Sequence, residues 1–323
     1  MPKSIDALQP AAEDLVAFSR ERIEKGSKSF AVAAKLFDPE TRASAYMLYA
    51  WCRHCDDVID GQSLGFAQSE TDNPTGEAAL DLVRQLREKT AAACDGQADE
   101  PVFQALSVVC AKHDIPAKYP LDLIAGFQMD AEAKRYQTIE DTLAYCYHVA
   151  GVVGVMMAMV MGVKERAVLE RACDLGLAFQ LTNIARDIVP DHAVDRVYLP
   201  QDWLDDAGLL RTNLADQSRR PQLSQVAELL LDTAEPYYQS ASFGLPHLPL
   251  RSAWAVATAL KVYRAIGLRV RQHGQRAWDQ RARTSTLSKL GGVGSGLGVA
   301  LASRSNRDGY RKSPRTGLWT MPD

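Results

Sequence analysis

The ten residues WCRHCDDVID (residues 51–60) place three carboxylates and an arginine inside sequence that otherwise has the apolar pattern of a buried helix. Side chains three, four and seven positions apart share one face of an α-helix. The first acidic row on that face consists of Tyr49, Arg53, Asp56 and Asp60, with Asp57 at its edge. Because Asp56 and Asp60 repel each other at this spacing unless a cation lies between them, the stretch indicates a cation site.

The same design returns in residues 172–189, ACDLGLAFQLTNIARDIV. The second acidic row consists of Gly176, Gln180, Asn183 and Asp187, and Asp191 continues it. Pro190 is expected to end the regular helix just before Asp191. Arg186 flanks Asp187 as Arg53 precedes Asp56.

Together the two rows predict a site for a diphosphate bridged by divalent ions. Asp56, Asp60, Asn183 and Asp187 offer only oxygen ligands, which suit Mg²⁺ or Mn²⁺ rather than zinc. Mg²⁺ usually shares its remaining positions with water and phosphates, and neighbouring arginines bind phosphate in a bidentate way. This prediction requires the two rows to face each other in a helical bundle. Two solvated helix faces are the alternative, which the apolar surroundings of both rows disfavour.

The chain is predicted to be all-α, as a helical bundle, because strand signals are almost absent. Helical patterns cover residues 41–60, 80–94, 101–112, 118–132, 140–162, 165–189, 222–242 and 250–280. Loops are expected at residues 61–76, 95–100, 191–213 and 244–249, the first being a candidate lid.

The length suits one large helical domain or two small ones, and we predict one domain over residues 1–283. A poorly ordered tail, rich in Gly, Ser and Arg, is predicted over residues 284–323. The glycine-rich stretch 291–298 lacks the spacing and preceding strand of a nucleotide-binding loop, so it is interpreted as flexible.

The overall composition, with 46% apolar residues and a net charge of −3, is that of a soluble globular protein. It lacks the excess of basic charge that is typical of a nucleic-acid-binding protein. Basic residues outnumber acidic ones after Lys261, which favours contact with an anionic membrane surface or a solvated tail. The apolar run 149–163 is shorter than the ~20 residues of a membrane span and predicts a buried helix. The six cysteines are expected to be reduced, and the Cys52–Cys55 pair has no second pair with which to bind zinc.

Two further segments are candidates for contact with substrate. The stretch GSKSF supplies hydroxyls, an ammonium group and backbone N–H groups that suit phosphate oxygens; its candidate residues are Ser27, Lys28, Ser29 and Phe30. On the apolar helix around residue 150, Ala150, Gly151 and Gly154 indicate either close helix packing or an apolar tunnel. His148 on this helix is a core histidine or a base, and the sequence leaves both open.

Four motifs resemble the squalene/phytoene synthase family of head-to-head prenyl synthases, and within it the bacterial phytoene synthases. They are YAWCRHCDDVID (49–60), YCYHVAGVVG (145–154), AFQLTNIARDI (178–188) and DRVYLP (195–200), and the likeness covers roughly residues 20–280. The resemblance implies an isoprenoid-synthase fold whose central cavity holds two prenyl diphosphates. It assigns Mg²⁺ binding to Asp56, Asp60, Asn183, Asp187 and Asp191. It assigns diphosphate binding to Ser27, Lys28, Ser29, Phe30, Tyr49, Arg53, Gln180 and Arg186.

The activity implied is that of a prenyltransferase of carotenoid biosynthesis, which condenses two geranylgeranyl diphosphates through prephytoene diphosphate to 15-cis-phytoene. Catalysis would rest on Arg53, Asp56, Asp60, Asp187 and Tyr145, while Tyr145 and Tyr263 would line the reacting region. The product forms by proton loss, so no NADPH is expected. The long hydrocarbon substrates predict a cytoplasmic enzyme in peripheral contact with the inner membrane, where it has access to neighbouring carotenoid enzymes.

Two alternatives stay open at this level. A C30 synthase acting on farnesyl diphosphate would carry the same motifs, because tunnel depth sets chain length. A noncatalytic prenyl-lipid-binding protein would keep the fold, but such a protein would be expected to have lost one of the two acidic rows.

Overall fold

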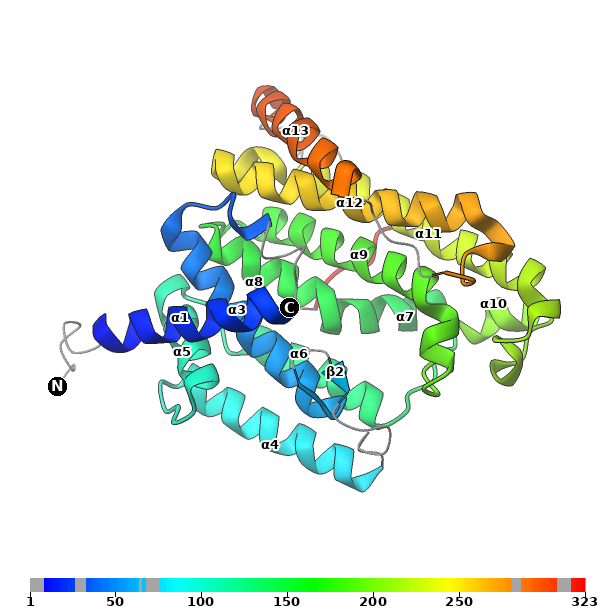
Figure 1. Cartoon of the computed structure of the whole chain (residues 1–323), viewed down its shortest axis with the longest axis horizontal. Helices are drawn as coiled ribbons and strands as arrows, with labels where there is room; N and C mark the ends of the chain where they lie inside the picture. The colour runs from blue at the N-terminus through cyan, green and yellow to red at the C-terminus, as the bar shows by residue number, and fades with distance from the viewer. Residues whose placement is uncertain are drawn as a thin grey trace. The chain divides into compact units, whose positions relative to one another are not determined.

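The computed structural model describes residues 9–26, 33–63, 66–67, 76–280, 286–306 and 315–322. The protein is all-α, as predicted, and its helices are drawn in Figure 1. Within these residues the only strands are β1 (Gln62–Ser63) and β2 (Phe66–Ala67), which pair antiparallel inside the expected loop 61–76. Most of that candidate lid lies outside the described residues.

The chain divides into two compact units, Met1–Glu132 with Met156–Gly162, and Ala133–Val155 with Val163–Asp323. The helices of the first unit are α1 (Gln9–Gly26), α3 (Pro39–Ile59), α4 (Glu77–Cys94), α5 (Pro101–His113) and α6 (Lys118–Ala131). Helix α3 is central, since it contacts the other four. Asp38 caps its start by accepting hydrogen bonds from the N–H groups of Glu40 and Thr41, with Pro39 in the first turn. Trp51 and Leu48 anchor it in the core.

The second unit is built around α9 (Arg166–His192), which packs against α11 (Arg220–Ser242), α12 (Leu250–His273) and α7 (Ile139–Cys146). Helix α7 continues through the π-helical turn η2 (Tyr147–Gly151) into α8 (Val152–Val160). The remaining helices of this unit are α10 (Gln201–Asp206), α13 (Thr286–Ser303) and the 3₁₀ turns η3 (Arg211–Asn213), η4 (Gln217–Arg219), η5 (Leu245–His247), η6 (Gly274–Arg276) and η7 (Arg304–Asn306). Helix α10 and η3 therefore lie within the expected loop 191–213, and η5 within 244–249.

The apolar run 149–163 is helical and largely buried, as predicted. The continuous helical stretch Ile139–Val160 is long and apolar enough to cross a membrane by length and composition, but 61% of its most apolar window is buried inside the protein. Burial of this extent is typical of the core helix of a globular fold.

The expectation that Pro190 ends its helix is wrong, because α9 runs on to His192. Tertiary packing overrides the missing backbone donor: Ile188 is buried, and the N–H of Ala193 still bonds to the carbonyl of Val189 at 3.1 Å. Continuous helix keeps Asp191 one turn beyond Asp187, so Asp191 belongs to the second acidic row.

The Gly/Ser/Arg-rich tail 284–323, which was predicted to be poorly ordered, contains a helix that the sequence analysis did not predict. Helix α13 occupies Thr286–Ser303 and packs along α12 (Figure 1). Gly292 and Gly296, four residues apart, form the packing face: a Cβ added at Gly296 would lie 2.4 Å from Thr258 Oγ1 and 3.0 Å from its backbone nitrogen. The indole N–H of Trp254 also donates to the carbonyl of Val293 at 2.7 Å. The glycines thus allow close helix packing rather than flexibility. The boundary at residue 283 itself lies outside the described residues.

Candidate functional site

The first acidic row lies on α3, where Arg53 binds two carboxylates of its own helix. Its Nη1 lies 3.0 Å from Asp56 Oδ2, and its Nε and Nη2 donate to Asp57 Oδ1 at 2.9 and 2.7 Å. Burial alone would lower the pKa of Arg53, but the charges of Asp56 and Asp57 outweigh it and raise the pKa. Arg53 is therefore a fixed cation at physiological pH.

The three aspartates of this stretch have different surroundings. The Asp56 side chain is 41% exposed and Asp60 is half-buried at the C-terminal cap of α3, so both are accessible to a ligand. Asp57 is buried, with its side chain 8% exposed. Asp57, which the helical spacing placed only at the edge of the row, thus orients Arg53, while Asp56 and Asp60 present the carboxylates.

Two other polar groups of the motif, Cys52 and His54, are half-buried. Burial raises the pKa of Cys52 to about 12, and burial lowers the pKa of His54, whose ring meets Phe103 edge-on at 5.6 Å. A protonated thiol is a poor metal ligand and a poor nucleophile. All six cysteines are free thiols.

The second acidic row lies on α9, in the second unit. Arg186 and Asp187 form a two-point ion pair, in which Nε lies 3.0 Å from Oδ1 and Nη2 bonds Oδ2. Both side chains are largely buried, at 14% and 12% exposure. Gln180 accepts a long hydrogen bond of 3.4 Å from the amide of Asn183. The row pairs its arginine and aspartate as the first row does.

The surroundings of Asn183 fit a cation that prefers oxygen ligands. Its Oδ1 atom is buried and has no hydrogen-bond partner among the residues that the structure describes. A buried carbonyl oxygen without a protein donor is costly in a folded protein unless another group binds it, and a cation is one such group. It lies one turn from Asp187, so the row offers amide and carboxylate oxygens together, which are the ligands that Mg²⁺ and Mn²⁺ prefer.

Among the residues that the structure describes, neither unit contains a preformed metal cage. Across its described residues, neither contains a cluster of three His, Cys, Asp or Glu side chains that could hold a metal ion. Each row contributes at most two carboxylates, a set typical of Mg²⁺ sites that also use water and phosphate oxygens.

An aromatic cluster surrounds Tyr145 in the second unit. Tyr145 is buried and stacks on Tyr198 of the DRVYLP motif, with ring centroids 4.6 Å apart and an interplanar angle of 17°. Tyr136 meets both rings, at 5.4 and 6.1 Å. The hydroxyl of Thr142 donates to the carbonyl of Tyr198 at 3.0 Å, which ties the motif to α7. Tyr136 and Tyr198 were not among the predicted site residues, although the quoted DRVYLP motif contained the signal for Tyr198.

Of the remaining candidate residues, the structure describes Tyr263, Tyr49 and His148 but not those of the GSKSF stretch. Tyr263 is half-buried on α12 and stacks on Phe179 of α9 at 4.1 Å. Tyr49 is half-buried on α3. His148 is half-buried in η2, with its ring 5.1 Å from that of Tyr147. Ser27, Lys28, Ser29 and Phe30 lie outside the described residues.

Known proteins resemble this chain in sequence and in fold. The family model "Squalene/phytoene synthase" matches residues 23–288. A 15-cis-phytoene synthase from Enterobacter agglomerans is 56% identical over 300 residues, which cover 93% of this chain and all of the relative. A 15-cis-phytoene synthase from Pantoea ananas is 53% identical and covers 94% and 96% of the two chains. A crystal structure of a dehydrosqualene synthase in complex with ligand has a TM-score of 0.79, with 28% identity over 92% of this chain and 99% of that chain.

Both acid-bearing helices lie inside the matched region, and the all-α fold is that of the solved structure. The chain belongs to the squalene/phytoene synthase family.

Proposed function

We propose that this protein is a prenyltransferase that joins two molecules of geranylgeranyl diphosphate head to head, through prephytoene diphosphate, into 15-cis-phytoene for carotenoid biosynthesis. The observation that carries the proposal is 56% identity to a 15-cis-phytoene synthase along the whole length of that relative. Both acidic rows are intact, which disfavours a noncatalytic lipid-binding role.

The residues of the rows suit the handling of diphosphate. Arg53 and Arg186 supply planar guanidinium groups that bind phosphate oxygens in a bidentate way. Asp56, Asp60, Asn183, Asp187 and Asp191 would hold Mg²⁺ or Mn²⁺. When bound, the ions supply electrostatic stabilisation of the departing diphosphate. When no metal ion is bound, Arg53 neutralises Asp56 and Arg186 neutralises Asp187.

The aromatic and apolar residues serve the hydrocarbon part of the reaction. The π-faces of Tyr145 and Tyr198 stabilise positive charge that develops on an allylic chain. The apolar helices around them exclude water, which would otherwise capture such a cation. Proton loss ends the reaction, so no reduced nicotinamide cofactor is required.

The first experiment is an assay of purified protein with geranylgeranyl diphosphate and Mg²⁺. We expect diphosphate release and a C40 product with the absorption of a conjugated triene, loss of both on chelation with EDTA, and recovery with Mg²⁺ or Mn²⁺. A protein that binds substrate but forms no C40 product in detergent or lipid would refute the proposal. Because the dehydrosqualene synthase is a close structural relative, farnesyl diphosphate is assayed in parallel; faster turnover of this C15 substrate would establish the C30 alternative.

We also propose a cytoplasmic location with peripheral contact to the inner membrane, supported by the basic residues after Lys261. Two of these charges are already paired within the protein, Arg264 with Glu235 and Arg271 with Asp232, each at 2.6 Å. We expect sedimentation of the full chain with anionic liposomes at low salt, and release at high salt. Equal binding to neutral liposomes would contradict the electrostatic basis. Association with neighbouring carotenoid enzymes stays a prediction.

A further inference from the structure

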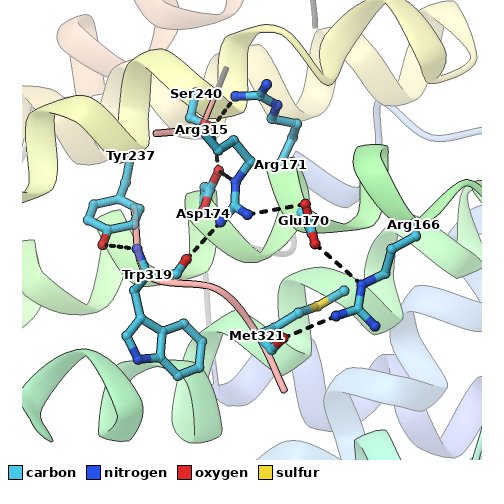
Figure 2. Close-up of polar contacts among 9 residues, drawn as sticks. All are labelled: Arg166, Glu170, Arg171, Asp174, Tyr237, Ser240, Arg315, Trp319 and Met321. Atoms are coloured by element: carbon cyan, nitrogen blue, oxygen red, sulfur yellow. Dashed lines mark hydrogen bonds and ion pairs between the residues drawn. The ribbon is translucent and has the colours of Figure 1, made fainter. Parts of the chain in front are cut away.

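The C-terminal residues 315–322, named the C-terminal strap, belong to the second unit and contact residues that are far from them in the sequence (Figure 2). Arg315 binds two acids of α9: its Nε and Nη2 donate to Asp174 at 2.9 and 2.7 Å, and its Nη1 donates to Glu170 at 3.1 Å. The Arg315 side chain is only 11% exposed. The strap thus begins with a buried, two-point ion pair.

Asp174 is the centre of this contact and is fully buried. Burial raises the pKa of Asp174, whereas hydrogen bonding and the charge of Arg315 act to lower it. The hydroxyl of Ser240 on α11 also donates to Asp174, and Arg171 donates to Ser240 at 2.7 Å. A buried carboxylate needs this set of partners, because an unpaired charge in the interior is strongly destabilising.

The other end of the strap reaches the π-helical turn η2. The N–H of Trp319 donates to the Tyr237 hydroxyl at 3.0 Å, and its indole ring lies 5.3 Å from the ring of Tyr147. The Met321 side chain is buried, and its carbonyl accepts a hydrogen bond from Arg166 at 3.0 Å. The strap therefore touches α9, α11 and η2 at once.

These contacts lie where η2 meets α9. A Cβ added at Gly176 would lie 2.4 Å from the carbonyl oxygen of Ala150, so the two backbones touch. Tyr147 stands two residues after Tyr145 of the aromatic cluster, and Asp174 stands two residues before Gly176, the first member of the second acidic row. π-Helical turns are rare and are frequent at functional sites, where the surrounding structure holds them in place.

We propose that the C-terminal strap is a positioning element of the second unit. It holds η2 against α9 and so fixes the position of the aromatic cluster relative to the second acidic row. The expected effect of the strap on turnover rests on the proposed function, whereas its expected effect on hydrogen exchange in η2 does not. Arg315 and Trp319 are positioning residues; neither is proposed to touch substrate.

The test compares Arg315→Ala and Trp319→Ala with the conservative variants Arg315→Lys and Trp319→Phe. Arg20→Ala is the matched control, because it removes an arginine from an exposed ion pair with Glu24. Hydrogen exchange of the substrate-free protein is followed in peptides that cover η2 and the first half of α9. Steady-state kinetics then separate kcat from KM for the prenyl diphosphate, per folded molecule.

We expect faster exchange in η2 for both alanine variants and a fall in kcat on the order of 10- to 100-fold, as for a misplacement of about 1 Å. KM should change by less than about threefold, since the diphosphate ligands are untouched. Trp319→Phe should retain most of the activity and Arg20→Ala all of it. Hydrogen exchange in η2 at the wild-type rate would overturn the proposal. A wild-type kcat in a variant with a lowered melting temperature would also overturn it, because the strap would then contribute to stability alone. An inactive wild-type protein would instead overturn the proposed function, while the exchange experiment would still decide the role of the strap.

A pH series adds a readout specific to the ion pair. The groups that face Asp174 are Glu170, Arg171 and Cys173 on α9, Tyr237 and Ser240 on α11, and Arg315. Without Arg315 the pKa of Asp174 rises further, so the folded variant takes up a proton more readily than the unfolded chain. Stability gained in this way is present at low pH and is lost as the pH rises through the folded pKa. The deficit in melting temperature of Arg315→Ala relative to wild type should therefore be larger at about pH 8 than at about pH 5; a constant deficit would contradict the ion-pair role.

Discussion

The variant Asp187→Asn is expected to lose turnover by on the order of 100-fold or more, while its helix content stays that of the wild type. Asparagine preserves the shape of the side chain but removes the charge that both Arg186 and a divalent ion would bind. Loss of a single hydrogen-bond partner behind a metal ligand already costs about 10- to 100-fold, so loss of a ligand charge should cost at least as much. Asn183, one turn earlier on α9, adds a buried Oδ1 oxygen that has no donor among the described residues.

The measurement is kcat as a function of Mg²⁺ concentration. A metal ligand predicts that the apparent affinity for Mg²⁺ falls together with kcat, and that high Mg²⁺ restores part of the activity. Asp205→Asn is the control, because Asp205 is an exposed carboxylate on α10 that accepts a hydrogen bond from Gln201. If Asp187→Asn kept near-full activity at low Mg²⁺, the metal assignment on α9 would be wrong.

The variant Gly176→Ala is expected to destabilise the fold by about 3 kcal/mol, near the upper end for an overpacked core. The new Cβ would lie 2.4 Å from the Ala150 carbonyl oxygen and 2.6 Å from Gly151 Cα. These are backbone atoms, which cannot rotate away as a side chain can, so η2 and α9 must move apart. In an exposed helix the same change stabilises by up to about 1 kcal/mol, which makes the sign of the effect diagnostic.

Gly294→Ala provides the matched control on α13. Nothing lies within 4 Å of a Cβ built there, so this variant should be neutral or slightly stabilising. Chemical unfolding of both variants gives the two free energies directly. Equal stability of Gly176→Ala and Gly294→Ala would show that α9 and η2 are not in backbone contact.

Much of the fold could be predicted because apolar spacing and end signals agree along most helices. The expected helix 101–112 is α5, Pro101–His113, with Pro101 in its first turn. The second acidic row was predicted from spacing alone, and continuous α9 keeps its members on one face. Local sequence decides such features, since each depends on residues within a few turns.

Features that depend on distant residues were missed. A helical pattern does not distinguish the π-helical turn η2 from α-helix. The turn lies where the backbones of Ala150 and Gly176 touch, a contact between residues that are distant in the sequence. The glycine content of residues 291–298 hid α13, although the spacing of Gly292 and Gly296 was a usable signal for helix contact. Helical spacing placed Asp57 only at the edge of the first acidic row, and Arg315 lies in a segment that was predicted to be poorly ordered. Only the fold shows that each is paired in the interior.

The C-terminal strap also has a consequence for the order of events during synthesis. Arg315 and Asp174 are separated by 141 positions in the chain. A ribosome that adds ~5–20 residues per second needs roughly 7–28 s to cover them. For that interval Asp174 of α9 has no arginine from the strap, so the second unit completes its packing only after residues 315–322 have been synthesised.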